Sequence, residues 1–492
     1  MSELSSNLRE AAVDRLYPRI GLHIDGTWIY DRTACHEVAN PSDESTLGPV
    51  PRATPSDLEL ALSAADRGFK VWRETAPEQR AALLLRVAGL LRTRAGAIAP
   101  IITLEQGKPV ADARAEVERA STFLEWDAAQ LLRTCGSVAP SEPGMQRMVI
   151  RQPIGPVAAF TPWNVPISSP SRKISGALAA GCSIVIKAAE ETPGAACAFV
   201  QCFIDAGLPA GVLNLVFGDP GEISTTLIAS PVIRMVTLTG SVPVGMQLSK
   251  LAGAAMKPVL MELGGHAPVL VCDDVDATRV ARLAVASKMR MAGQICASPS
   301  RFIVHERVYS EFVSAFAAAA NEIRVGDGFA PNVQMGPVIN ARRLATMESL
   351  VADARACGAK VVAGGHRIGD RGCFFAPTVL ADVPPDASVM RTEPFGPLAV
   401  CVPMKDLDEG LALANGLSVG LSAYAFTNSL HDAERITREL ECGVLSINHF
   451  GAPGADLPFG GVKDSGIGRE GGEGSLDAYR VSKTVLQKAA RI

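Results

Sequence analysis

The sequence predicts an α/β protein built from two doubly wound α/β domains and a small β arm. Three observations support this class. The first third of the chain keeps apolar residues at helical spacing. From about residue 150, short runs rich in Val, Ile and Leu alternate with helical segments, which predicts βαβ units and a buried parallel sheet. After Gly264 and Gly265 the alternation begins again and predicts a second sheet.

The first third should hold three long helices. Residues 55–74 open with Pro-Ser and keep a helical apolar spacing. Residues 76–108 continue this spacing until Gly107 and Pro109 stop it, and residues 110–135 form the third helix.

Strands and helices then alternate in two groups. The first group has the strands VAAFTP, CSIVIKA, VLNLVFG and MVTLTG, separated by the helices RKISGALAAG, PGAACAFVQCFIDAG and PGEISTTLIAS. The second has the strands APVLVCD, RFIVHE, AKVVAGG and LAVCVPM, with the helices DATRVARLAVASKMR, VYSEFVSAFAAAANEI and NARRLATMESLVADARACG. Only a Gly-Gly pair joins the two groups, so we expect closely apposed domains with a cleft between them, where pockets are favoured.

Two short segments fit neither domain. Residues 147–152 (RMVIRQ) and 481–488 (VSKTVLQK) resemble edge strands. Exposed strand edges are usually covered, so these segments should pair within the chain or add to the sheet of another subunit.

Composition narrows the class of protein. The net charge of −4 comes without a Lys/Arg stripe, which argues against a nucleic-acid binder. No uncharged apolar run approaches the ~18 residues that span a bilayer, and the N-terminal residues have no apolar core of a secretion signal, so we expect a cytoplasmic protein and no membrane partner. The 11 cysteines include no C-x-x-C pair, which predicts neither a metal site nor a disulfide framework.

A glycine-rich turn, GSVPVG at 240–245, follows the strand MVTLTG and opens a helix. Its glycines would let a phosphate reach the N–H groups at the helix N-terminus. It is not a P-loop, because Met246 and Gln247 stand where Lys and Ser/Thr are needed. The motif alone fits a tight strand–helix turn as well as a dinucleotide site.

Three further motifs place polar side chains at strand ends, where ligands of parallel sheets bind. Asn164 in FTPWNVP is either the cap of a rigid turn or an amide donor to an oxyanion. Lys187 and Glu190 in KAAEE are either solvated charges or contacts to an adenosine ribose, and the Glu would disfavour a 2′-phosphate. Glu262 in MELGG is either half of a salt bridge or a general base whose pKa burial raises.

Cys296 in GQICASPSR differs in position from the other cysteines. It follows a helix and a Gly-Gln turn at the junction of the two domains and precedes the strand RFIVHE. A core cysteine is not expected there, although nothing in the local sequence makes it a thiolate.

Taken together, the motifs resemble those of the aldehyde dehydrogenase superfamily. EQGKP, FTPWNVP, KAAEETP, LTGSVPVG, MELGGHAP, GQIC, EPFGP and LPFGGVKDSGIGREGG occur in this order over nearly the whole chain. The resemblance implies NAD(P)-dependent oxidation of an aldehyde to an acid through a cysteine thioester. Cys296 matches the nucleophile, and Asn164 matches the amide that forms the oxyanion hole with the Cys296 backbone N–H. Glu262 matches the general base.

The resemblance also implies the cofactor, the domains and the assembly. The cofactor would be NAD, with NADP possible, and it would contact Thr161, Pro162, Trp163, Lys187, Glu190, Gly218, Gly240, Ser241, Val244, Gly245, Leu263, Glu393 and Phe395. The expected domains are a Rossmann-like NAD(P)-binding domain at 1–134 and 153–262 with 446–479 returning to it, a catalytic domain at 263–445, and an oligomerisation arm at 135–152 and 480–492. The arm implies a homodimer or homotetramer.

Within the superfamily, the sequence is most similar to α-ketoglutaric semialdehyde and succinate-semialdehyde dehydrogenases. Arg172 and Arg290 match arginines that such enzymes use for the distal carboxylate of the substrate, and Phe450 lies in a loop that varies with substrate. Met291 departs from the usual Asn, and Ser241 is followed by Val-Pro rather than Thr-Glu. Neutral aliphatic or aromatic aldehydes remain an alternative, and a cofactor-independent thiol esterase is the alternative from a different class.

Overall fold

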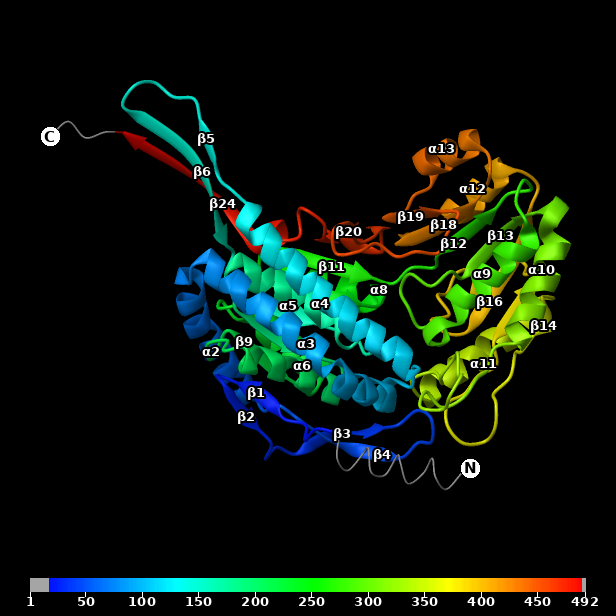
Figure 1. Ribbon diagram of the computed structural model, residues 1–492, viewed down its shortest axis with the longest axis horizontal. Helices are drawn as coiled ribbons and strands as arrows, with labels where there is room; N and C mark the ends of the chain where they lie inside the picture. The colour runs from blue at the N-terminus through cyan, green and yellow to red at the C-terminus, as the bar shows by residue number, and fades with distance from the viewer. Residues whose placement is uncertain (1–16, 489–492) are drawn as a thin grey trace.

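The computed structural model describes residues 17–488. The ranges expected for the first domain and the arm also include residues 1–16 and 489–492, which lie outside the described part. Two large sheets occupy two lobes, and a narrow β arm projects from one of them (Figure 1). This arrangement confirms the predicted α/β fold class, while the residue boundaries of the domains stay a prediction.

The first lobe is built around an eight-stranded sheet of order β2-β1-β9-β8-β7-β10-β11-β22. Its five central strands are parallel, and antiparallel strands close both edges. The central strands are almost wholly buried, as expected for a parallel sheet covered on both faces. The strands are β1 (Leu22–Ile24), β2 (Thr27–Ile29), β7 (Val157–Phe160), β8 (Ile184–Lys187), β9 (Leu213–Val216), β10 (Met235–Gly240), β11 (Val259–Leu263) and β22 (Gly466–Ile467).

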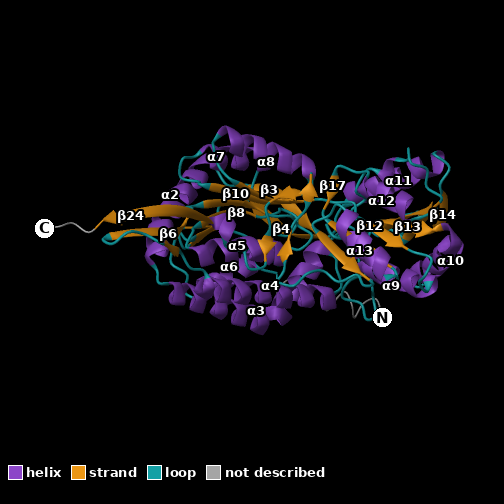
Figure 2. Ribbon diagram, turned by 90° about the horizontal axis from the view of Figure 1, so that it is seen from above, coloured by secondary structure: helices purple, strands orange, loops and turns teal. Residues whose placement is uncertain are grey.

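Helices cover both faces of this sheet. Figure 2 shows α7 and α8 on one side and α3, α4 and α6 on the other. The helices of this lobe are α2 (Pro55–Glu74), α3 (Pro77–Gln106), α4 (Val110–Arg133), α5 (Ser168–Ala180), α6 (Pro193–Asp205), α7 (Pro220–Ala229) and α8 (Val242–Ala254). By length and composition α3 could cross a membrane, but 56% of its apolar stretch is buried, as in the core helix of a folded protein.

The second lobe holds a seven-stranded sheet of order β14-β15-β16-β13-β12-β18-β19, parallel except for the edge strand β14. Its strands are β12 (Pro268–Val271), β13 (Arg301–His305), β14 (Lys360–Ala363), β15 (Thr378–Ala381), β16 (Leu398–Met404), β18 (Ser422–Phe426) and β19 (Val444–Ile447). Its helices are α9 (Ala277–Met289), α10 (Glu306–Asn321), α11 (Ala341–Ala356), α12 (Leu407–Asn415) and α13 (Leu430–Glu439). A separate apolar core fills this lobe.

The arm consists of β5 (Ser137–Ala139), β6 (Met145–Pro153) and β24 (Arg480–Lys488). β24 pairs antiparallel with β6 along its whole length, from Arg480 opposite Pro153 to Lys488 opposite Met145. The two segments that the sequence marks as edge strands therefore pair with each other within one chain.

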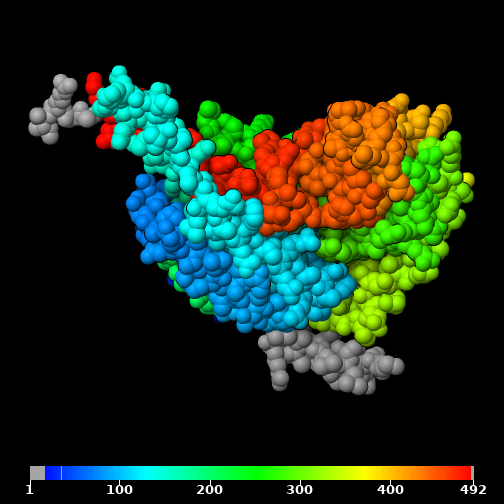
Figure 3. Space-filling model, turned by 45° about the horizontal axis from the view of Figure 1, so that its top comes forward, coloured from blue at the N-terminus to red at the C-terminus, as the bar shows by residue number. Residues whose placement is uncertain are grey.

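The C-terminal part of the chain crosses between the lobes before it enters the arm (Figure 3). On this path, β20 (Pro458–Phe459) pairs with β23 (Glu470–Gly471), and β22 joins the edge of the first sheet beside β11. The path matters for the site because it brings Phe459 and Glu470 to the junction of the lobes.

Candidate active site

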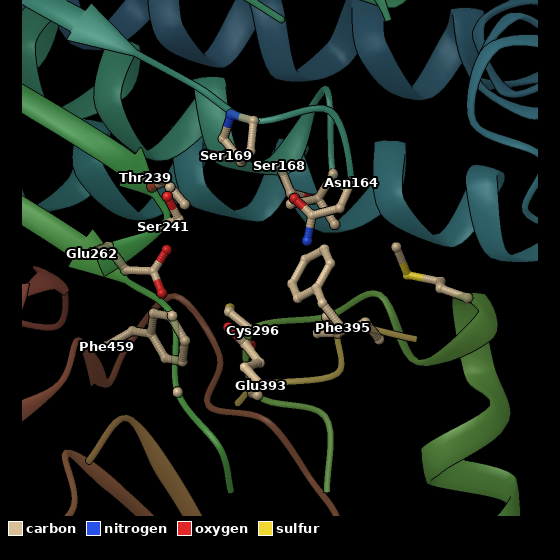
Figure 4. Close-up of a pocket in the computed structure, with 18 of the residues that line it drawn as sticks. Asn164, Ser168, Ser169, Thr239, Ser241, Glu262, Cys296, Glu393, Phe395 and Phe459 are labelled. Carbon is tan, nitrogen blue, oxygen red and sulfur yellow. The ribbon is translucent and has the colours of Figure 1, made fainter. Parts of the chain in front are cut away.

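A cavity of about 720 Å³ lies at the junction of the lobes and takes its lining from both of them. Figure 4 shows Asn164, Glu262, Cys296, Glu393 and Phe395 around this cavity. The predicted site residues on its wall are Pro162, Trp163, Asn164, Arg172, Gly240, Ser241, Glu262, Arg290, Cys296, Glu393 and Phe395. Residues that are far apart in the sequence are thus brought together.

The loop that carries Cys296 begins with a left-handed turn. Met291, Ala292 and Gly293 have φ angles of 51°, 52° and 69°. Such angles are rare for residues with a side chain and are held only where the surroundings impose them. Here the turn is pressed against the neighbouring loop, since a Cβ on Gly293 would lie 2.1 Å from the carbonyl oxygen of Gly396. The turn therefore fixes the loop of Cys296 against the segment that carries Glu393 and Phe395.

Cys296 itself is half-buried beside Glu262. Burial raises the pKa of its thiol, and the negative charges of Glu262 and Glu393 raise it further, whereas the backbone N–H of Ala297 lowers it. In this state the sulfur keeps its proton, and Glu262 is the nearby carboxylate that can remove it.

Glu262 ends strand β11 and points into the cavity (Figure 4). Burial, with the nearby carboxylate of Glu470, raises the pKa of Glu262 to about 7, although Lys173, the Cys296 thiol and Arg172 oppose this rise. Its Oε1 atom is buried without a hydrogen-bond partner in the described structure. A carboxyl group with this pKa can take up and release a proton near neutral pH, as a general base must.

Asn164 is fixed by a buried network. Its Nδ2 donates to the backbone carbonyl oxygen of Gln294 at 3.0 Å, which leaves the second N–H of the amide without an acceptor among the described residues. The backbone carbonyl oxygen of Asn164 accepts from Lys108 Nζ at 2.7 Å, and the same ammonium contacts Glu116 at 2.5 Å. Glu116 in turn accepts from the backbone N–H of Ile167 at the start of α5. Lys108 and Glu116 thus hold the backbone of Asn164 in place, and neither was predicted to act at the site.

The start of helix α8 suits a phosphate group. Ser241 is the N-cap, yet its side chain makes no capping hydrogen bond and lines the cavity. A Cβ on Gly245 would lie 2.4 Å from Leu263, so a glycine is needed for α8 to pack on β11. The buried Thr161 hydroxyl, on the loop after β7, also has no partner within the described residues. These open donors fit the pyrophosphate of a dinucleotide at a helix N-terminus.

Lys187 and Glu190 lie together at the end of β8. Lys187 Nζ donates to Glu190 at 2.6 Å, and the other oxygen of Glu190 accepts from the backbone N–H of Gly218 at 3.3 Å. Glu190 and Gly218 line a second cavity of about 600 Å³ rather than the first. The two charges satisfy each other here, and their predicted contact with a ribose hydroxyl stays a prediction.

Glu393 and Phe395 come from the opposite lobe. Burial raises the pKa of Glu393 to about 8, while the backbone N–H of Gly265 lowers it. A Cβ on Gly264 would meet the Glu393 carboxylate at 2.5 Å, so the Gly-Gly pair allows this close approach. The ring of Phe395 packs edge-on against Trp163, with the ring centroids 5.6 Å apart, and both rings line the cavity.

Some predicted site residues do not line the cavity, and some residues that line it were not predicted. Phe450 does not line the cavity; its ring packs against Tyr424 and Phe426 at 5.0 and 4.9 Å. Gly245 and Leu263 form the packing of α8 on β11 behind the wall, and Val244 on the same helix is exposed and does not line the cavity. The lining residues that the sequence analysis missed include Asp112, Arg119, Phe123, Phe459 and Glu470. For the three of these residues that lie on α4, the sequence signal is the helical spacing of residues 112, 115, 116, 119 and 123, which places one face of the helix on the cavity.

Among residues 17–488, no three His, Cys, Asp or Glu side chains gather as metal ligands would.

Comparison with known proteins agrees with this geometry. Residues 28–485 match the Aldehyde dehydrogenase family. The chain is 46% identical to the 4-(hydroxymethyl)benzenesulfonate dehydrogenase of Comamonas testosteroni over 95% of this chain and 98% of that one. It is 39% identical to the NADP⁺-dependent succinate-semialdehyde dehydrogenase of Escherichia coli over 93% and 95%. The crystal structure of succinate-semialdehyde dehydrogenase from Burkholderia pseudomallei superposes with a TM-score of 0.92 at 39% identity, covering 96% of this chain and 98% of that one. The chain therefore belongs to the aldehyde dehydrogenase family.

Proposed function

We propose that this NAD(P)-dependent aldehyde dehydrogenase oxidises an aldehyde that carries a second, anionic group. The main candidates are the carboxylate-bearing semialdehydes, α-ketoglutaric semialdehyde and succinate semialdehyde. The observation that carries the proposal is the side chain of Arg172, which lines the cavity with a buried Nη1 atom that has no hydrogen-bond partner among residues 17–488. A buried guanidinium without a partner is costly, and a substrate anion would complete it.

In the proposed reaction, Cys296, Glu262 and Asn164 each carry out a separate step. Glu262 removes the proton of the Cys296 thiol, and the thiolate adds to the aldehyde carbon. The second N–H of the Asn164 amide, with the Cys296 backbone N–H, stabilises the resulting alkoxide. When bound, the nicotinamide group supplies the oxidant that accepts the hydride. Cys296 then holds the acyl group as a thioester, and Glu262 deprotonates the water that hydrolyses it to the acid.

Aromatic aldehydes are a second candidate. One relative, at 46% identity, is a dehydrogenase of 4-(hydroxymethyl)benzenesulfonate, a ring that carries an anion. In this chain, the Arg172 guanidinium lies 3.9 Å from the ring centroid of Phe123 and 5.4 Å from that of Phe459. Apolar ring surface next to a cation supports a substrate of this kind, while neutral aldehydes would leave the cation without a partner.

We also propose NAD as the preferred cofactor, because the Glu190 carboxylate at the ribose end would repel a 2′-phosphate. The arm supports a homodimer or homotetramer, since β24 exposes Val481 and Leu486 beyond the body of the protein. A cytoplasmic location completes the proposal, because the cysteine spacing favours a reducing compartment.

A steady-state panel tests the substrate class. Values of kcat/KM would be measured with α-ketoglutaric semialdehyde, succinate semialdehyde, 4-formylbenzenesulfonate, butanal and benzaldehyde, each with NAD⁺ and with NADP⁺. The anionic aldehydes should be preferred, and Arg172→Met should lower kcat/KM for them on the order of 10- to 100-fold while butanal changes little. If the neutral aldehydes have the higher kcat/KM in the unaltered enzyme, the proposal is wrong.

A further inference from the structure

One face of helix α4 forms a wall of the large cavity. The residues that face it are Asp112, Ala115, Glu116, Arg119 and Phe123. Their spacing of three or four residues keeps them on one side of the helix. Arg119 therefore points to the same space as Arg172 from α5 and Arg290 from the end of α9.

These three guanidiniums have no ion-pair or hydrogen-bond partner among residues 17–488, whereas the acidic residues around them are mostly engaged. In the structure of residues 17–488, none of the three arginines forms an ion pair or a side-chain hydrogen bond. Glu116 pairs with the buried ammonium of Lys108, and Glu470 pairs with that of Lys173 at 2.6 Å. The ion-pair partners of these carboxylates are thus lysines. Glu470 still acts on the charge of Arg172, and Glu116 on that of Arg119, but the N–H groups of the arginines remain available to a ligand.

The other charged groups at this end of the cavity do not neutralise the positive charges of the three arginines. Asp112 is the carboxylate that Arg290 influences, but burial dominates and raises the pKa of Asp112. Glu262 lies at the inner end, where Arg172 acts on it. Two further lining arginines, Arg343 and Arg391, belong to the other end near Glu393 and contribute nothing here.

The three arginines form an inner and an outer group. Arg172 is close enough to Cys296 and Glu262 to interact with their charges. Arg119 interacts instead with Arg172 and Arg290, and their positive charges, after burial, lower its pKa. Two guanidiniums that repel each other at the rim of a cavity are stabilised when an anion lies between them.

The number of donors bears on the shape of that anion. A simple carboxylate has two oxygens, and a single guanidinium can bind both in a bidentate pair. A sulfonate has three terminal oxygens, and a 2-oxo carboxylate has two carboxylate oxygens and a ketone oxygen. Three guanidinium forks directed into one space match such three-acceptor groups better than they match a carboxylate.

We propose that Arg119 is a specificity-determining residue, which binds the third acceptor oxygen of a sulfonate or 2-oxo carboxylate headgroup while Arg172 and Arg290 bind the other two. This inference rests on the proposed function, because it concerns the anionic end of the same substrate. It adds that the enzyme distinguishes one anionic headgroup from another.

The test compares short-chain aldehydes that differ in the headgroup. These are 4-oxobutanoate with a carboxylate, 3-oxopropane-1-sulfonate with a sulfonate, 2,5-dioxopentanoate with a 2-oxo carboxylate, and butanal with none. Arg119→Met should lower kcat/KM on the order of tenfold for the sulfonate and the 2-oxo acid, mainly through KM, but less than about threefold for 4-oxobutanoate. Arg119→Lys should restore part of the loss, because it returns the charge without the fork.

Arg114→Met is the matched control. Arg114 is an exposed arginine on the same helix that pairs with Glu118 and does not line the cavity. This variant should behave like the unaltered enzyme, and butanal kinetics should be the same in all variants. Equal losses for the three anions in Arg119→Met, or no loss, would overturn the inference. A wild-type enzyme that prefers butanal would instead overturn the proposed function, so the two failures are distinguishable.

Discussion

The raised pKa of Glu262 gives a sharp expectation for the effect of pH on turnover. The base is active only when ionised, and its pKa is about 7. The ionised fraction is therefore about 0.9 at pH 8 and about 0.1 at pH 6. Since deprotonation of the water requires this form, hydrolysis of the thioester should slow about tenfold over this range. The loss occurs as pH falls through 7, because protonation removes the base.

Rapid-mixing measurements of NADH formation separate the two half-reactions. In Glu262→Gln, a first burst of NADH should remain but form more slowly, because the proposed mechanism also uses Glu262 to deprotonate Cys296, whereas steady-state turnover should fall by about 100-fold or more. The inflection near pH 7 should disappear from the residual turnover of this variant. Loss of the burst itself, or an inflection that persists, would refute the assignment of Glu262 as the base for hydrolysis.

A second substitution tests the physical cause of the raised pKa. The carboxylate of Glu470 raises the pKa of Glu262, and Lys173 lowers it. Glu470→Gln removes the negative neighbour and leaves the positive one, so the inflection should move below pH 7. An unchanged inflection would mean that the charge of Glu470 does not act on the base.

Three further outcomes are expected. Lys108→Met leaves the buried Glu116 carboxylate without its ion pair and should lower the free energy of unfolding in urea by about 3–5 kcal/mol; a loss below about 1 kcal/mol would contradict the role of the pair. Glu190→Ser should raise kcat/KM for NADP⁺ relative to NAD⁺ by about tenfold or more, because a like charge next to the 2′-phosphate is removed; an unchanged ratio would argue against Glu190 as the discriminating residue. Gly293→Ala places a Cβ 2.1 Å from the oxygen of Gly396 at a φ of 69°, so thermal unfolding should show a lower Tm, and an unchanged Tm would mean that the turn can open freely.

Much of the fold could be predicted because the decisive patterns are local. The helix expected at 55–74 has these bounds in the structure, and the strand MVTLTG spans Met235–Gly240 as expected. The short strands at the N-terminus were not predicted, because they are only three to six residues long and carry few β-branched residues in a row.

The site was predictable where a motif carries it and hidden where tertiary structure makes it. Asn164, Glu262 and Cys296, each of which belongs to one of the ordered motifs, line one cavity, and their chemical roles stay a prediction. The left-handed turn at Met291 was not foreseen, since a non-glycine residue gives no signal for a positive φ. Arg119 could not be recognised until the helix on which it lies was seen to face the cavity.

The geometry of α4 also bears on how enzymes of this design can diverge. In the proposed mode of binding, one face of this helix contacts the anionic end of the substrate. The nucleophile, the base and the oxyanion amide lie on loops and strand ends elsewhere in the cavity wall. Substitution of one cavity-lining residue on this helix face would therefore change the preferred headgroup without moving any reacting atom. Substrate preference could diverge through single substitutions on α4, while the groups that carry out the oxidation stay the same.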